Sequence, residues 1–229
     1  MSELVLNLAM LSKAQRVLWP SLHEIPHGFV LYGGTALALR LGHRTSVDFD
    51  FFSSRLVDPD ALLSSVPFLK GGVVAQRSQN VLTVWVNSMP EERPVKVAFF
   101  GDLGLPVLER PDRQGSNGIV VASLRDLAGT KAKVINQRVE LKDYEDIAAL
   151  LDARMSLPEI VAAALAIFPA QVDYATTVSA ITYFEDGEAK LFPESLKKKL
   201  RSAAMGASPV RTPQPSYRSI EASAAALGR

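Results

Sequence analysis

The spacing of apolar residues over the first hundred positions predicts strands alternating with helices. Apolar side chains recur every three or four residues over 4–19, which is the period of an amphipathic helix, and Pro20 would end this helix. Over 46–52, polar and apolar residues alternate with a period of two, as in a strand with two distinct faces. Similar patterns predict strands at 28–32, 73–77, 81–86 and 95–100, and helices at 35–41 and 59–63.

From Ser123 onward the apolar spacing is helical. Ser123 and Asp126 have the spacing of a capping box at a helix start. Beyond position 206 the chain is rich in Ser, Pro, Ala and Arg, a composition typical of segments without fixed structure. The predicted helices cover 123–137, 142–153, 157–168 and 172–184.

Together these elements predict an α/β (α+β) fold in three parts. Residues 1–122 would form a core made of a mixed sheet with flanking helices, and residues 123–205 a helical C-terminal lobe. Residues 206–229 would form a disordered basic tail. With 48% hydrophobic residues in 229, the chain can bury a sizeable core.

The composition narrows the possible chemistry. The absence of cysteine excludes disulfides, thiolate nucleophiles and zinc sites built on sulfur, and three histidines are too few for a site made mainly of histidine. No run of about eighteen apolar residues is present. The N-terminal stretch lacks a basic segment followed by an apolar block, so we expect a cytoplasmic protein.

Charge is distributed unevenly along the chain. The formal net charge is +1, but residues 196–229 hold seven Lys and Arg against one Glu, so this segment carries about +6 and the remainder about −5. A basic segment of this kind can bind a polyanion such as RNA. It can equally be a solvated helix end followed by a flexible tail, and the sequence leaves both interpretations open.

Two aspartates on the strand predicted at 46–52 form a candidate metal site. Asp48 and Asp50 lie two residues apart, so their side chains project from one face with Cα atoms about 7 Å apart. Phe49 and Phe51 would point into the core from the opposite face. Two neighbouring carboxylates need a compensating cation, and Mg²⁺ (or Mn²⁺) commonly takes one or two carboxylates together with substrate phosphates.

A glycine pair lies one short helix before this strand. Gly33 and Gly34 follow a predicted strand, and Thr35 is the predicted N-cap of the next helix. The free N–H groups of a helix N-terminus bind anions, and glycine lets a phosphate approach closely. Thr35 adds a hydroxyl donor. Combined with the two aspartates, this loop predicts a site for the triphosphate of an NTP.

Residues 33–52 resemble the first motif of the AbiEii/AbiGii toxin-type nucleotidyltransferases, within the polymerase-β superfamily. The shared features are the glycine pair, the Leu-Gly-His-Arg-x-Ser stretch and the D-x-D-x-F strand. Residues 127–146 resemble the helical segment of that family with the pattern K-(7)-R followed by (R/K)-D-x-x-D. The resemblance extends over about residues 28–155.

The resemblance implies both a fold and an activity. The fold would be the polymerase-β-like mixed sheet with a helical C-terminal lobe. The activity would be transfer of a nucleoside monophosphate from an NTP to an acceptor hydroxyl, and relatives act as type IV toxins paired with a cognate antitoxin. In some relatives the acceptor is the 3′ end of a tRNA, which makes tRNA or other RNA a candidate partner here.

Carried over position by position, the resemblance also assigns roles to residues. Gly34 and Thr35 would hold the triphosphate, together with the neighbouring Gly33. The candidate catalytic residues are Asp48 and Asp50, which would hold the metal, Lys131, which would bind nucleotide phosphates, and Asp143, a polar position near the nucleotide.

Several neighbouring residues have open roles. Lys131 and Arg138 are seven residues apart on one helix face and could present two positive charges to phosphate. Arg44 and Ser46 could contact phosphate or hold the two aspartates in place. The alternatives are structural: Lys131 could be an ordinary surface lysine, and Asp143 could cap a helix or pair with Arg138, as could Asp146. His43 is more simply a structural hydrogen-bonding residue.

One departure from the superfamily pattern concerns a third carboxylate. Polymerase-β enzymes commonly carry one on a later strand as the base for the attacking hydroxyl, and the corresponding position here is Ala98, with Asp102 past the strand end. A metal that lowers the pKa of the acceptor hydroxyl could partly replace that base. Ala98 leaves open a nucleotide-binding regulatory module without turnover. A kinase that transfers to a protein hydroxyl is a further alternative, because the resemblance is to a superfamily with relatives of that kind.

Overall fold

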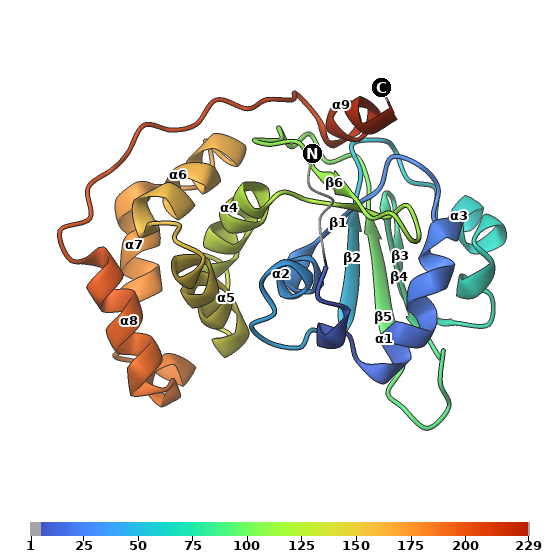
Figure 1. Ribbon diagram of the computed structural model, residues 1–229, viewed down its shortest axis with the longest axis horizontal. Coiled ribbons are helices and arrows are strands. Elements are labelled where there is room, and N and C mark those ends of the chain that lie inside the picture. The colour runs from blue at the N-terminus through green and yellow to red at the C-terminus, as the bar shows by residue number, and fades with distance from the viewer. Residues whose placement is uncertain (1–5, 229) are drawn as a thin grey trace.

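A seven-stranded mixed sheet forms the centre of the protein, in a computed structural model that describes residues 6–228 (Figure 1). The strand order is β3-β4-β5-β2-β1-β7-β6. β2 pairs in parallel with β5 and antiparallel with β1, and β1 pairs in parallel with β7. The strands are β1 (Val30–Tyr32), β2 (Asp48–Phe52), β3 (Val73–Ser78), β4 (Val81–Val86), β5 (Val95–Phe100), β6 (Asp112–Arg113) and β7 (Val120–Val121).

The mixed sheet with flanking helices confirms the predicted fold class. The five longer strands lie where the sequence predicts them, whereas the two-residue strands β6 and β7 are additions. Helices α2, α4 and α5 lie on one side of the sheet, with α6, α7 and α8 beyond them, while α1 and α3 cover the other side (Figure 1). The α-helices are α1 (Lys13–Leu18), α2 (Gly33–Leu41), α3 (Pro59–Ser65), α4 (Leu124–Ile135), α5 (Leu141–Asp152), α6 (Leu157–Ile167), α7 (Tyr174–Thr182), α8 (Glu194–Ala204) and α9 (Ile220–Ala225).

The single helix predicted over 4–19 is wrong for the part that the structure describes. A 3-10 turn at Leu8–Met10 is followed by α1 and then by a 3-10 helix at Trp19–Glu24, while positions 4 and 5 lie outside the described residues. Ser12 starts α1 as its N-cap, with a reciprocal capping box to Gln15. Pro20 does not stop a helix but occupies the first turn of the next one, where its missing N–H costs nothing.

Helix α2 begins two residues earlier than predicted. Its N-cap is Tyr32 rather than Thr35, and no side chain caps this end. Thr35 is buried within the first turn, and its hydroxyl donates a hydrogen bond to the Asp48 carbonyl oxygen. Helix α2 is thereby tied directly to β2, the strand that carries the two aspartates. Gly42, with φ +66°, ends the helix in the left-handed conformation.

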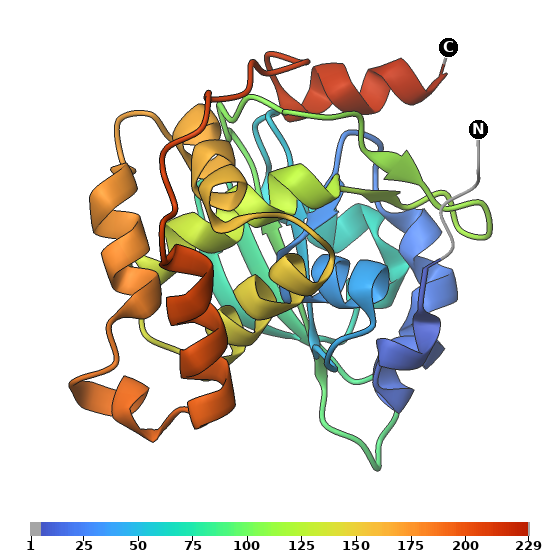
Figure 2. The same ribbon diagram turned by 60° about the vertical axis from the view of Figure 1, so that its left-hand side comes forward.

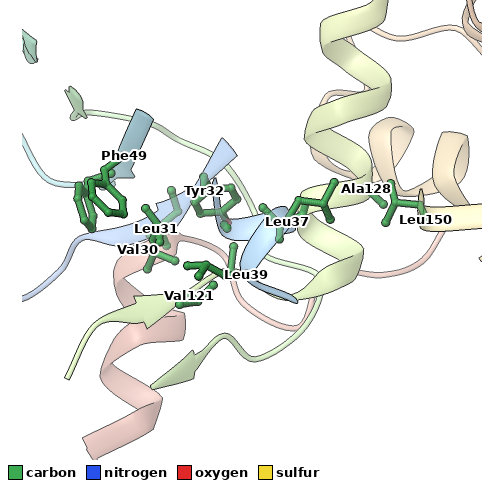
Figure 3. Packing of buried hydrophobic residues seen from close by; sticks show 14 of the residues in the cluster. Val30, Leu31, Tyr32, Leu37, Leu39, Phe49, Val121, Ala128 and Leu150 are labelled. Carbon is green, nitrogen blue, oxygen red and sulfur yellow. The ribbon is translucent and has the colours of Figure 1, made fainter. Parts of the chain in front are cut away.

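One hydrophobic core extends across the predicted boundary at 122/123. Leu31 and Phe49 from the sheet, Leu37 from α2, and Ala128 and Leu150 from α4 and α5 belong to the same cluster (Figure 3). The division of the chain into a core and a helical lobe stays a prediction, because packing is continuous between the two parts.

The start of α4 links the helices to the loop that precedes β6. Ser123 accepts a hydrogen bond from the Asp126 backbone N–H, as the predicted cap requires. The buried Asp126 carboxylate accepts from the backbone N–H groups of Leu108 (2.8 Å) and Glu109 (3.1 Å). Asp126 therefore holds a distant loop in place in addition to its place in the first turn of α4.

The segment 206–229 differs from the disordered tail that the sequence predicts. Through Gly228 it follows a defined path from α8 back to the sheet and ends in α9 (Figure 2). Tyr217 exchanges two backbone hydrogen bonds with Val107, and Ile220 is fully buried. These two residues stand among many Ser, Pro and Ala residues, so the composition of the segment does not reveal that they are held in place.

The basic charge of residues 196–229 is also partly neutralised. Lys197, Lys199 and Arg201 on α8 pair with Glu194, Asp152 and Glu185. This favours the interpretation of a solvated helix over that of an RNA-binding segment. Among the described residues, no helix combines the length and the apolar composition needed to span a membrane.

Close packing of α4 against α6 gives a stability prediction. A Cβ atom at Gly129 would lie 2.8 Å from Ile167 Cδ1 and 2.9 Å from the Ala163 carbonyl carbon and oxygen, so Gly129→Ala forces the helices apart. Such overpacking costs about 1–3 kcal/mol, against a gain in helix propensity of about 1 kcal/mol. We expect a lower free energy of unfolding in urea. Gly104→Ala, where the added Cβ meets nothing within 4 Å, is the control and should leave it unchanged.

Candidate active site

Strands β2 and β5 present three side-chain pairs in parallel register on one face of the sheet. The alternation of β2 places Phe49 and Phe51 in the core, as predicted, and leaves the other face partly accessible. The pairs on that face, in order along the strands, are Asp48 with Lys96, Asp50 with Ala98, and Phe52 with Phe100.

The two aspartates have different surroundings. Lys96 Nζ lies 2.8 Å from Asp48 Oδ2 in a partly exposed ion pair. Asp50 is more enclosed, and burial raises the pKa of its carboxyl; the charge of Lys96 opposes this shift and the charge of Asp48 adds to it. Sequence reasoning missed Lys96. The signal was present, since Lys96 is a charged residue in an otherwise apolar strand.

The glycine pair is required by the side chains that surround it. Gly33 has φ +74°, and a Cβ there would collide with Asp50 Oδ2. A Cβ at Gly34 would lie 2.8 Å from Arg44 Nη2 and 3.0 Å from Ser46 Oγ. Because no side chain caps α2, the N–H groups of its first turn are free to bind an anion.

Two fully buried carboxylates on α5 hold the basic residues of the site. Asp146 accepts a bidentate pair of hydrogen bonds from Arg44 (2.7 and 2.8 Å) and one from His43 Nε2 (2.7 Å). Lys131 Nζ bridges Asp146 (2.6 Å) and Asp143 (3.0 Å). Arg138 Nε donates to Asp143 at 2.8 Å. This buried ion network joins the α2–β2 connection to α4, α5 and the α4–α5 connection.

The network keeps both buried carboxylates ionised. Burial alone would raise the pKa of Asp146, but hydrogen bonds from His43 and Arg44 and the charge of Lys131 lower it well below its ordinary value. The pKa of Asp143 is lowered in the same way: burial opposes, and the Arg138 hydrogen bond and the Lys131 charge outweigh it. Arg44 therefore binds Asp146 rather than Asp48 or Asp50.

A pocket of about 560 Å³ lies between the sheet and α4. Its lining brings together most of the residues that the sequence nominated: Gly33, Gly34, Arg44, Ser46, Asp48, Asp50, Lys131 and Arg138, with Lys96 and Lys142 in addition. Thr35 and Asp143 are not in the lining. Thr35 lies beneath the loop and uses its hydroxyl within the fold, and Asp143 lies behind Lys131 and Arg138. The catalytic and binding roles of all these residues stay predictions.

The pocket continues into a second, more apolar one of about 380 Å³. Both are lined by Phe52, Phe100, Thr130, Val134 and Gln137. The second adds Leu103, Leu105, Lys133, Phe168 and Gln171. The Phe52 and Phe100 rings meet edge to face with centroids 5.4 Å apart. One cleft thus has an ionic end at the aspartates and an aromatic end at the phenylalanines.

Comparison with known families agrees with this geometry. The model of the family described as "Nucleotidyl transferase AbiEii toxin, Type IV TA system" matches residues 16–222. The chain belongs to the AbiEii family. The resemblance that the motifs indicate is confirmed, over more of the chain than the motifs cover, and this AbiEii protein is a nucleotidyltransferase.

Individual proteins are similar to this chain in sequence or in fold. An uncharacterized protein of Aquifex aeolicus (strain VF5) is 30% identical over 173 residues, which are 74% of this chain and 80% of that protein. A solved H. pylori protein, assigned as a nucleotidyltransferase, shares the fold at TM-score 0.50 and 17% identity, over 90% of this chain and 93% of its own. MenT4, a nucleotidyltransferase toxin of Mycobacterium tuberculosis H37Rv, shares the fold at TM-score 0.55 and 14% identity, over 82% of this chain and 78% of its own.

The buried ion network predicts a specific pH dependence of stability. Because the folded-state pKa of Asp146 lies below the ordinary aspartate value of about 3.9, its ionised form stabilises the fold above that pH, and this contribution is lost as the pH falls further. Asp146→Asn leaves its basic partners without a compensating negative charge and should lower the free energy of unfolding by about 3–5 kcal/mol at pH 7.

The measurement is urea unfolding at pH 7 and at pH 3.5. The variant should lose less stability than the wild type between the two values. Asp152→Asn, which removes an exposed partner of Lys199, serves as the control and should behave as the wild type. Equal pH dependence in wild type and Asp146→Asn would show that Asp146 is not held ionised by the network.

Proposed function

We propose that this AbiEii protein transfers a nucleoside monophosphate from an NTP to an acceptor hydroxyl, with release of pyrophosphate. The observation that carries the proposal is the convergence of three features on one pocket: the Asp48 and Asp50 carboxylates, the uncapped N-terminus of α2, and the basic side chains of the buried ion network. These are the groups that a metal-bound triphosphate requires.

The residues present fit a divalent metal, Mg²⁺ or Mn²⁺. Asp48 and Asp50 offer hard oxygen ligands side by side at an open pocket, and such ligands suit either ion. When bound, such an ion polarises the α-phosphate and lowers the pKa of an attacking hydroxyl. Within residues 6–228 no cluster of three or more potential ligands occurs, so substrate oxygens and water would complete the coordination.

The triphosphate would lie against Gly33 and Gly34. Their backbone N–H groups belong to the first turn of α2, where the helix dipole favours negative charge. Arg44, Lys131 and Arg138 line the same pocket. Since the two buried aspartates hold these three side chains in place, they are positioned in advance for the phosphates.

The base and ribose would occupy the aromatic end of the cleft. Phe52 stacks on Tyr32, with centroids 4.7 Å apart, and contacts Phe100 edge to face, so the wall of the second pocket is rigid and apolar. Aromatic walls of this kind stack on bases with little preference for sequence. Gln137 and Gln171 place amide groups at the same pocket, where they could bind the edge of a base.

In the reaction, the acceptor oxygen forms a bond to the α-phosphorus and the bond from the α-phosphorus to the bridging oxygen breaks. Pyrophosphate takes the electron pair, and the hydroxyl proton passes to water. No carboxylate stands beside Asp50 at Ala98 to receive that proton. Binding and orientation by this chain would supply part of the rate enhancement, since positioning can contribute about 7–11 kcal/mol.

We infer that the acceptor is a tRNA or another RNA, and that a cognate antitoxin restrains the activity in the cytoplasm. The support is membership in a family of type IV toxins and the likeness of fold to MenT4, a nucleotidyltransferase toxin. The basic residues of α8 add little support for RNA binding, because Lys197, Lys199 and Arg201 already pair with carboxylates of this chain.

Removal of a metal-binding carboxylate tests the transferase assignment. Purified protein is incubated with Mg²⁺, each α-³²P-labelled NTP in turn, and total cellular RNA. Asp48→Ala should lower labelling of RNA by at least about 100-fold, because the variant no longer holds the metal ion that would compensate the charge on the phosphates. The control Asp60→Ala removes an exposed aspartate that pairs with Arg77, and it should label RNA as the wild type does.

The other outcomes separate the alternatives. Full turnover by Asp48→Ala would contradict the assignment of the metal site. Binding of NTP without any transfer would favour a regulatory module and make Ala98 its explanation. Transfer of the γ-phosphate to protein, seen with γ-labelled NTP, would favour a kinase.

The aromatic end of the cleft gives a separate prediction for nucleotide affinity. Loss of one base-stacking ring costs about 1–3 kcal/mol, so Phe100→Ala should weaken NTP binding by about 5- to 150-fold in equilibrium dialysis. Tyr183→Ala, which removes an exposed ring on the C-cap of α7, is the control and should leave affinity unchanged. Wild-type affinity in a folded Phe100→Ala protein would place the base elsewhere.

A further inference from the structure

Lys96 lies on β5 beside the proposed metal site. On β5 it faces the cleft on the same side as Ala98 and Phe100, directly opposite Asp48 in the parallel register. Its Nζ atom lies 2.8 Å from Asp48 Oδ2, and both side chains are partly exposed at the pocket. Lys96 is therefore close enough to touch whatever Asp48 binds.

The surroundings of Lys96 leave little room for two metal ions. In a two-metal site the ions lie about 3.5–4 Å apart, and each of them needs oxygen ligands. On β5 the position beside Asp50 is Ala98, which has no ligand atom, and one oxygen of Asp48 already contacts an ammonium. On β4, the residue opposite Ala98 is Thr83, which has no charge to offer.

An ammonium and a second divalent ion at the same carboxylate would repel each other. Asp48 Oδ2 can compensate the charge of only one of them. The ammonium of Lys96 is part of the chain and already lies beside this oxygen. A lysine also carries three donors on a flexible stem, which suits contact with a phosphate oxygen as well as with a carboxylate.

We propose that this site binds one divalent ion per chain, and that the Lys96 ammonium supplies the second positive charge beside Asp48. This inference rests on the proposed nucleotidyl transfer. Lys96 contacts Asp48 in the free protein and an α-phosphate oxygen when the nucleotide is bound. The role differs from that of a residue that only holds Asp48 in place, and the two roles predict opposite effects on metal affinity.

The first measurement is Mn²⁺ affinity of the full chain without nucleotide, by equilibrium dialysis or by the loss of the free-ion spin-resonance signal. Lys96→Met removes the repulsion and should strengthen Mn²⁺ binding by about tenfold or more. Lys70→Met, which removes an exposed lysine outside the cleft, is the control and should leave affinity unchanged. Weaker or equal binding in a folded Lys96→Met protein would overturn the proposal.

The second measurement is the number of Mn²⁺ ions bound per nucleotide, with the α,β-methylene analogues of ATP, GTP, CTP and UTP in turn. The wild type should bind one ion for each bound analogue, and the double variant Lys96→Met with Ala98→Asp should bind two. Two ions per analogue in the wild type would overturn the proposal.

Nucleotidyl transfer provides a third readout. Lys96→Met should transfer at least about 100-fold more slowly despite its tighter Mn²⁺ binding, and Lys96→Arg should recover part of the rate because the charge is kept. If none of the four analogues binds, the proposed nucleotidyl transfer fails, while the nucleotide-free Mn²⁺ comparison still decides the role of Lys96.

Discussion

The candidate site depends on two carboxylates that do not line its pocket. Asp143 and Asp146 are fully buried on α5, and burying charge is costly unless every carboxylate oxygen is compensated. Here Arg44, Lys131 and Arg138 compensate them at hydrogen-bonding distances, with His43 as a fourth donor. The arrangement fixes the distance between the α2–β2 connection and the helices, and with it the width of the cleft.

This network also explains why the glycine pair has so little freedom. Arg44 is held against Gly34 by Asp146, and Asp50 is held against Gly33 by the register of β2. The side chains of Asp50 and Arg44 thus lie against the two residues that begin α2, and only glycine, which has no Cβ atom, leaves room for them. The start of α2 and the buried ion network therefore depend on each other, because Arg44 contacts both Gly34 and Asp146.

Local patterns in the sequence predicted the parts of the fold that depend on neighbours in the chain. The alternation around Asp48 and Asp50 gave β2 its two faces, and the glycine pair marked the start of α2 within two residues. The sequence did not predict the partner of Arg44, because Asp146 lies 102 residues away. The importance of Lys96 depends on the register between β2 and β5, which periodicity within one strand cannot supply.

The return of the chain to the sheet at its C-terminus bears on how the protein is made. The strand with both aspartates ends at Phe52, and the turn after it is fastened by α9: Ser54 accepts a hydrogen bond from the Glu221 backbone N–H, and Arg55 pairs with the Glu221 carboxylate. These partners are 166 and 167 residues apart in the chain. During synthesis this turn cannot form these contacts until α9 has left the ribosome, so a chain that ends before α9 lacks both of them.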